Sequence, residues 1–199
     1  MRNVAILIDG GHVRACVKQA GLPYTPALVV KIARASVASD ERLFRIQYYD
    51  CEPFAGTVKL PVSGQAKQYP GHDPFLSTLA CEELVAVRRG ILKFRGWERT
   101  AASLTAGTPA AALTDADFQA KWEQKGVDLR IGLDIVTITE CRGAEVIVLM
   151  TGDTDLIPAM KVARRRGLQV AGVSLPNRQV IPELKPHCDF VRQVLAWPM

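Results

Sequence analysis

Runs of apolar residues that end at glycine or aspartate recur along the chain and predict the buried strands of a sheet. Residues 3–8 are almost wholly apolar and lead into Asp9-Gly10-Gly11, and residues 145–150 form the clearest run, followed by Thr151-Gly152-Asp153. Strands that are apolar on both faces are typical of a parallel sheet covered by helices. Further strands are predicted at residues 42–49, 91–97, 168–175 and 190–195.

Segments typical of helices alternate with these strands. They cover residues 12–20, 27–38, 74–89, 128–140 and 156–166, with shorter helical segments at 114–124 and 182–185. Glycines at 21, 90 and 167 provide three of the helix ends. This alternation predicts an α/β fold with a mostly parallel central sheet and helices on both of its faces.

Two stretches interrupt the alternation. Residues 50–74 are rich in proline and glycine and are predicted to be a long loop or insertion, and residues 99–113 are predicted to be a flexible connection. The length of 199 residues and a hydrophobic content of 48% suit one folded unit. We therefore predict a single domain over residues 1–199 with insertions at 50–74 and 99–113.

Composition excludes several classes of protein. No apolar run approaches the ~18 residues that a membrane helix needs. The N-terminal apolar stretch is short and ends at Asp9, which is unlike a signal peptide, so we expect a cytoplasmic protein without a membrane partner. The five cysteines are scattered without CxxC spacing, so neither a zinc site nor a disulfide framework is expected.

Aspartates follow two of the predicted strands. Asp9 comes directly after the first, Asp153 lies shortly after the strand at 145–150, and Asp155 begins the next helix. Parallel strands bring such positions to one edge of the sheet, where ligands bind. Clustered carboxylates suit Mg²⁺ or Mn²⁺. Each aspartate alone also fits a turn or a helix N-cap, and it is their combination that favours a metal site.

Two more aspartates lie on the helix that precedes the second of these strands. Asp128 begins this helix and can aim at the sheet edge, although it also fits an ordinary N-cap. Asp134 is six residues further on, hence on a different face. Its neighbours are apolar, so it is a supporting group behind the metal ligands, a salt-bridge partner, or exposed.

Three motifs together resemble the NYN domain, and more narrowly its bacterial LabA-like branch. They are Ile8-Asp9-Gly10-Gly11, Lys125-Gly126-Val127-Asp128 with Asp134, and Thr151-Gly152-Asp153-Thr154-Asp155-Leu156-Ile157-Pro158. The family is similar to PIN-domain nucleases. The resemblance implies a Rossmann-like sandwich with strand order 3-2-1-4-5 and one or two divalent metals. It implies metal binding and catalysis by Asp9, Asp128, Asp153 and Asp155. In this chain Gly11 and His12 replace a polar Asn that many members carry.

The reaction expected from these residues is metal-dependent hydrolysis of phosphodiester bonds. RNA is favoured as substrate by the resemblance, and DNA stays open. A net charge of +5 agrees with a polyanionic partner. Candidate substrate-binding residues are Arg14, Lys18, Lys125 and Tyr69, whereas Arg164-Arg165-Arg166 fits the C-terminal end of a helix.

Other functions remain as alternatives. The same fold can bind RNA or a protein without cutting, and a small-molecule phosphatase would also use Mg²⁺. A haloacid-dehalogenase-type phosphatase is disfavoured because its first strand should end in DxD, and here Asp9 is followed by Gly10-Gly11. The chain lacks the GxxxxGK[ST] phosphate loop and has no GxGxxG after the first strand, which disfavours a P-loop ATPase and a nicotinamide dehydrogenase. The oligomeric state is open, a homo-oligomer included.

Overall fold

The computed structural model describes residues 1–107 and 109–198, and the chain divides into two compact units. The first unit comprises Met1–Asp50, Pro74–Arg89 and Gly126–Met199, and the second comprises Cys51–Asp73 and Gly90–Lys125. Apart from residues 50 and 74 themselves, both predicted insertions fall in the second unit. That all 199 residues form one domain stays a prediction.

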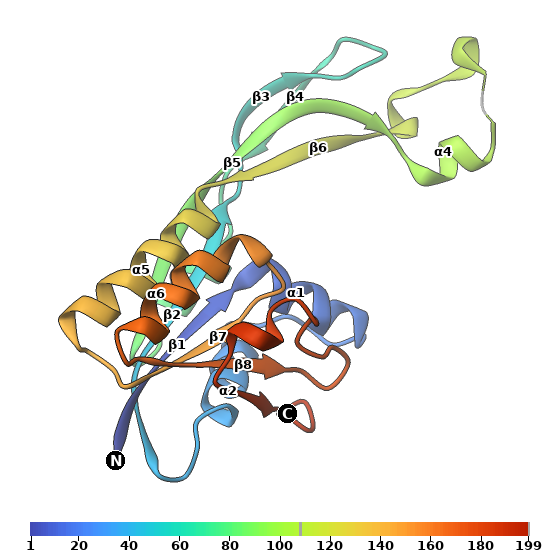
Figure 1. Ribbon diagram of the computed structural model, residues 1–199. Helices are drawn as coiled ribbons and strands as arrows, with labels where there is room; N and C mark the ends of the chain where they lie inside the picture. Colours follow the sequence, from blue (N-terminus) through green and yellow to red (C-terminus); the bar gives the residue numbers. More distant parts are fainter. Residues whose placement is uncertain (108, 199) are drawn as a thin grey trace. The chain divides into compact units, whose positions relative to one another are not determined.

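The main sheet has seven strands in the order β6-β5-β2-β1-β7-β8-β9 (Figure 1). β1 pairs in parallel with β2 and β7, β7 with β8, and β8 with β9, whereas β5 and β6 pair antiparallel. The predicted mostly parallel sheet is confirmed, and β5-β2-β1-β7-β8 has the expected order 3-2-1-4-5. The strands are β1 (Arg2–Asp9), β2 (Glu41–Glu52), β5 (Val85–Arg99), β6 (Phe118–Lys125), β7 (Val146–Met150), β8 (Gln169–Ser174) and β9 (Phe190–Gln193).

Helices cover both faces of the sheet. Val4, Ile6 and Ile8 of β1 pack into a cluster with α1, α2 and α3, while Ala5 and Leu7, which point to the other face, are equally buried. α5 contacts β1 and runs beside α6 (Figure 1). The structure is therefore the predicted α/β sandwich. Its helices are α1 (Gly10–Gln19), α2 (Pro26–Ala35), α3 (Pro74–Ala80), α5 (Val127–Cys141) and α6 (Ile157–Arg165).

The second unit consists largely of two hairpins. β3 (Ala55–Lys59) pairs antiparallel with β4 (Ala66–Pro70), and the outer half of β5 pairs antiparallel with β6. Half-buried aromatic side chains alternate along these strands and contact one another at ring distances of 5.2 to 6.3 Å. They are Phe54, Tyr69, Phe94, Trp97 and Trp122.

Several predicted elements were wrong. The stretch 50–74 is not a long loop, because it contains the β3–β4 hairpin. The helix predicted at 74–89 ends at Ala80, since residues from Val85 onward join the sheet as β5. The helix predicted at 114–124 is only a short 3₁₀ turn, Asp115–Asp117, followed by β6. In β3 and in the first half of β6, exposed and half-buried side chains alternate, as expected for a strand with one half-buried face.

Smaller corrections concern helix starts and a connection. α1 begins at Gly10, so Gly10 and Gly11 form its first turn instead of a separate turn. The predicted helical turn at 182–185 lies slightly later, as the 3₁₀ turn Lys185–His187. The stretch 99–113 contains α4 (Ala101–Thr105) and a short 3₁₀ turn, and residue 108 lies outside the described residues. Among the described helices, none combines the length and apolar character that a bilayer crossing requires.

Candidate functional site

Asp9 lies at the carboxyl end of β1 and is also the N-cap of α1. Its Oδ1 accepts a hydrogen bond from the backbone N of His12 at 3.2 Å, and its Oδ2 lies 3.3 Å from the hydroxyl of Thr151. Burial raises the pKa of Asp9, although these hydrogen bonds and the neighbouring His12 oppose the rise. Asp9 is thus a fixed, half-buried carboxylate for which the charged form is costly.

Asp153 follows the adjacent strand β7 and is held by two hydrogen bonds. Its backbone N donates to the hydroxyl of Thr151 at 3.0 Å, and its Oδ1 accepts from the backbone N of Asp155 at 2.9 Å. Asp153 therefore caps the 3₁₀ turn Thr154–Leu156. Through the Thr151 hydroxyl, it is linked to Asp9 on the neighbouring strand.

Asp128 in the first turn of α5 completes the acidic cluster. Burial raises the pKa of Asp128, and so do the charges of Asp153 and Asp9 and a hydrogen bond with Asp153. The structure thus brings Asp9, Asp128 and Asp153 together at one edge of the sheet. We call these three residues the acidic edge.

Asp155 is less closely associated with the other acids. It is exposed in the 3₁₀ turn after Asp153. Asp155 and Asp128 both line a hollow of about 480 Å³ between α5 and α6, which is otherwise mostly apolar. The role of Asp155 as a metal ligand stays a prediction.

Asp134 is a salt-bridge partner, one of the three readings that the sequence left open. Its side chain is buried, and its two oxygens accept hydrogen bonds from Arg88 at 2.8 and 2.9 Å. Oδ2 also accepts a hydrogen bond from the Tyr49 hydroxyl at 2.9 Å. As the six-residue spacing indicates, Asp134 faces away from Asp128 and is neutralised by its own arginine.

The predicted substrate-binding residues are dispersed. Arg14 forms an ion pair with the buried Asp50 at 2.9 Å, while Lys18 is exposed in the last turn of α1. Lys125 and Tyr69 belong to the second unit. There Lys125 pairs with Glu123, and Tyr69 packs edge-on against Trp122. The substrate contacts of these four residues stay predictions.

Two glycines make the acidic edge sterically possible. A Cβ on Gly152 would lie 3.0 Å from Nδ1 of His12, so His12 packs against the turn after β7. A Cβ on Gly10 would lie 2.4 Å from the Tyr48 hydroxyl.

Burial lowers the pKa of His12, the charge of Asp9 opposes this change, and the charge of Arg178 lowers the pKa further. His12 therefore faces the site rather than solvent alone.

Thr151, whose hydroxyl touches both Asp9 and Asp153, was not predicted to belong to the site. Its position directly after the apolar run at 145–150 was the available signal, since a polar residue there belongs to the same strand edge. Arg178 was also missed. It lies in the connection after β8, and no local pattern relates it to His12.

The donor set of the acidic edge suits a hard divalent cation. In residues 1–107 and 109–198, no three His, Cys, Asp or Glu side chains are grouped as a ready metal site. Mg²⁺, however, is commonly bound by only one or two carboxylates and keeps several waters. The contacting pair Asp128 and Asp153 supplies that number, and Asp9 lies close enough to affect the pKa of Asp128.

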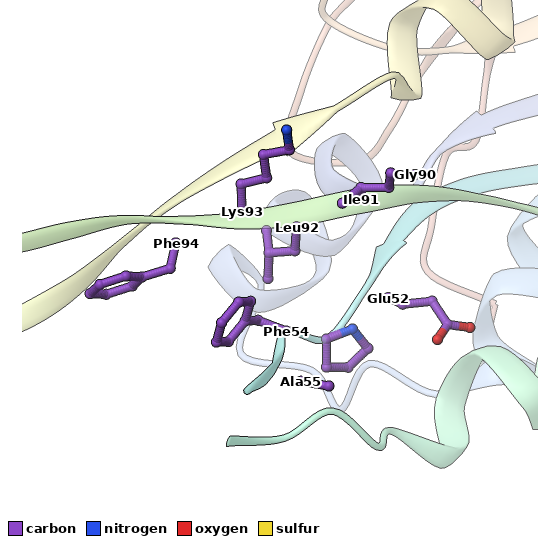
Figure 2. A pocket seen from close by; sticks show the side chains of 9 residues that line it. Glu52, Phe54, Ala55, Gly90, Ile91, Leu92, Lys93 and Phe94 are labelled. Atoms are coloured by element: carbon purple, nitrogen blue, oxygen red, sulfur yellow. The ribbon is translucent and has the colours of Figure 1, made fainter. Parts of the chain in front are cut away.

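A hollow in the second unit has a different character. It measures about 720 Å³ and lies between residues 52–55 and 90–94. Figure 2 shows Leu92 pointing toward Phe54, with Lys93 extending to the other side of the strand. The lining is mainly apolar and contains one acid, Glu52, and one base, Lys93. It lacks the grouped titratable side chains that distinguish the acidic edge.

Comparison with known proteins identifies the class of protein that this fold and edge define. The family model of the NYN domain matches residues 80–194, more than half of the chain, and the chain belongs to this family. A crystal structure of a protein of unknown function from Vibrio parahaemolyticus RIMD 2210633 shares the fold, with a TM-score of 0.51. It is 15% identical in sequence, and the alignment covers 97% of this chain and 93% of that one. No curated protein matches the chain.

Proposed function

We propose that the protein is a divalent-metal-dependent nuclease of the LabA-like branch of the NYN family, similar to PIN-domain nucleases, that hydrolyses RNA. The observation that carries the proposal is the acidic edge. Asp9 and Asp153 lie at the carboxyl ends of the parallel strands β1 and β7, and Asp128 reaches them from the first turn of α5. In the described part of the chain, none of the three forms an ion pair with lysine or arginine. Such a cluster favours an external cation.

Asp128 and Asp153 would hold Mg²⁺ or Mn²⁺, with Asp9 beside them and Asp155 reaching the site directly or through water. When bound, a divalent ion activates a water molecule and neutralises charge on the phosphate. The chain's own contribution is orientation. The backbone N of Asp155 and the Thr151 hydroxyl fix Asp153, and the backbone N of His12 fixes Asp9.

RNA is proposed as substrate from the family resemblance and the net charge of +5. Arg14 and Lys18 on α1, which follows Asp9 directly, are proposed to contact the phosphate backbone. Arg14 does so from a fixed position because Asp50 holds it. Lys125 and Tyr69 are proposed as further contacts from the second unit. A cytoplasmic location and a homo-oligomer stay predictions.

The test is cleavage of labelled single-stranded RNA and DNA with Mn²⁺ or Mg²⁺, comparing the native protein with Asp153→Asn. We expect cleavage of RNA only when metal is present, and a cleavage rate at least about 100-fold lower in the variant. Even substitution of a residue that only hydrogen-bonds to a metal ligand lowers metal affinity or activity by roughly 10- to 100-fold. The matched control is Asp40→Asn, an exposed acid that pairs with Arg2. Equal cleavage by native protein and Asp153→Asn would refute the proposal.

The second candidate is a non-catalytic module that binds RNA or protein. The NYN fold can carry such a module, because function depends on the site and not on the fold alone. If neither RNA nor DNA is cut with either metal, while the native protein still binds RNA, this function replaces the first.

A further inference from the structure

Three arginines surround a hollow of about 440 Å³ in the first unit, away from the ligands of the proposed metal site. Arg88 and Arg89 come from the first half of β5, and Arg130 comes from the first turns of α5. Val87 and Leu133 complete the lining, and Asp134 is its one acid. Asp134 pairs with Arg88, and the guanidinium of Arg130 adds a positive charge to the lining. We call this hollow the arginine pocket.

The guanidinium of Arg88 is fixed by the buried side of the pocket. Asp134 binds its Nε and one terminal nitrogen in the two-pronged geometry that suits a carboxylate, and Tyr49 supports Asp134 from behind. This ion pair uses two of the five N–H groups of an arginine, so three can donate to another anion. The Arg88 side chain is 49% exposed and therefore accessible.

Arg130 is fixed by the start of its own helix. One terminal nitrogen donates to the backbone carbonyl of Gly126 at 2.7 Å. Gly126 has a φ of +78°, and a Cβ there would lie 2.4 Å from that same nitrogen. Glycine at 126 thus provides both the left-handed backbone and the space in which the Arg130 guanidinium lies. The remaining N–H groups of Arg130 can donate to a ligand in the pocket.

We infer that the arginine pocket binds a backbone phosphate of a nucleic-acid strand. Arginine forks match the oxygens of a phosphate, and two guanidiniums held in advance lose little conformational freedom when it binds. Arg130 follows Asp128 by two residues at the start of α5 but lies on nearly the opposite face of this helix, so a strand that contacts both the arginine pocket and the acidic edge would pass over the N-terminal end of α5. The identity of the ligand rests on the proposed function, whereas the phosphate chemistry rests on the pocket alone.

The test measures binding of labelled single-stranded RNA in EDTA, where metal-dependent cleavage is absent, to native protein and Arg130→Gln. Loss of one phosphate contact should weaken RNA binding about tenfold at low salt. A plot of the logarithm of the binding constant against the logarithm of salt concentration should become shallower by about 0.7. The control is Arg165→Gln. Arg165 likewise donates to the carbonyl four residues earlier, that of Lys161, but lies at the C-terminal end of α6.

Arg130→Lys keeps the positive charge but loses the planar guanidinium that can donate two hydrogen bonds to one phosphate. Its affinity for RNA should therefore fall between those of native protein and Arg130→Gln. Inorganic pyrophosphate should displace RNA from native protein more effectively than from Arg130→Gln. Unchanged RNA affinity in a folded Arg130→Gln, or an equal loss in Arg165→Gln, would overturn the inference. If RNA is not cleaved but Arg130→Gln binds it weakly, the nuclease proposal fails and the phosphate site stands. If RNA is cleaved and Arg130→Gln binds normally, only the phosphate site fails.

Discussion

The two ends of the parallel strands hold acidic side chains in opposite electrostatic settings. At the start of β2, the fully buried Glu41 side chain contacts Arg192 at 2.6 Å and Arg2 at 3.2 Å. At the carboxyl ends of β1 and β7, Asp9 and Asp153 have no lysine or arginine partner among the residues described. At the first end Glu41 carries its own cations, whereas at the second end Asp9 and Asp153 lack them, although Asp50 on the neighbouring strand β2 pairs with Arg14.

This difference separates acids that stabilise the fold from acids that we propose to bind a metal ion. A buried carboxylate that pairs with an arginine ties elements together, as Glu41 does for β2 and β9. At the acidic edge, the charges of Asp153 and Asp9 raise the pKa of Asp128, and a cation bound there would offset this repulsion. Helix α5 shows both cases, with Asp134 paired to Arg88 and Asp128 facing Asp153.

The largest expected effect follows from giving the acidic edge its own cation. Asp128→Lys removes a proposed ligand and places an ammonium group beside Asp153. We expect RNA cleavage to fall by at least about 100-fold, because a fixed positive charge excludes a divalent cation from the site. The rise in melting temperature that Mn²⁺ should cause in native protein should also disappear. Cleavage assays and thermal unfolding with and without Mn²⁺ measure both effects.

The control for Asp128→Lys is Thr137→Lys, which adds a charge to an exposed position further along the same helix. It should keep both cleavage and the Mn²⁺ response. If Asp128→Lys still shows the full Mn²⁺ response, Asp128 does not contribute to a metal site.

A smaller effect is expected at the opposite end of the strands. Glu41→Gln keeps the size of the side chain but removes the charge that faces Arg192 and Arg2. We expect a loss of about 2 kcal/mol of unfolding free energy, because hydrogen bonds to charged groups are worth about 1.5–3 kcal/mol and a buried charge loses its partner. For a chain of this length that lowers the melting temperature by about 4–8 °C.

Glu41→Gln should keep the cleavage rate and Mn²⁺ response per folded molecule, measured at a temperature where it is fully folded. A loss of activity without a loss of stability would show that the two ends of the strands do not divide the roles as proposed.

The sequence predicted the acidic edge because its signals are local. Asp9 and Asp153 each stand just after an uninterrupted apolar run, and the sheet-edge rule then places them together. Asp128 was predicted from its place at the start of α5 and from the family resemblance. The link between Asp9 and Asp153 through the Thr151 hydroxyl requires the paired strands and could not be read from one segment.

The pairings that neutralise acids were not predictable in the same way. Arg88 lies in a segment that the sequence analysis predicted to be helical, whereas pairing with the sheet makes it part of β5. Its partner Asp134 is 46 residues away, and Tyr49 is 85 residues from Asp134. Contacts over such separations depend on the tertiary fold, which overrides local propensity.

The smallest expected effect concerns Asp9 in the absence of metal. Asp9→Asn keeps a good N-cap for α1 but removes a charge that burial disfavours, so the metal-free variant should be as stable as the native protein or more stable, by at most about 1 kcal/mol. Thermal unfolding in EDTA measures this. With Mn²⁺ the order should reverse, because the variant lacks a carboxylate at the site.

The pH dependence of unfolding free energy tests the direction of the stability difference between Asp9→Asn and native protein. Because the pKa of Asp9 is raised, the folded metal-free protein holds that proton to higher pH than the unfolded chain does. The contribution of Asp9 to stability is therefore present below its ordinary pKa of 3.8 and is lost as pH rises through the raised value. The advantage of Asp9→Asn over native protein should grow with pH across that window, and the difference between the two proteins cancels the titration of other groups. An advantage that shrinks as pH rises would mean that the fold stabilises Asp9 as a carboxylate and that Asp9 needs no cation.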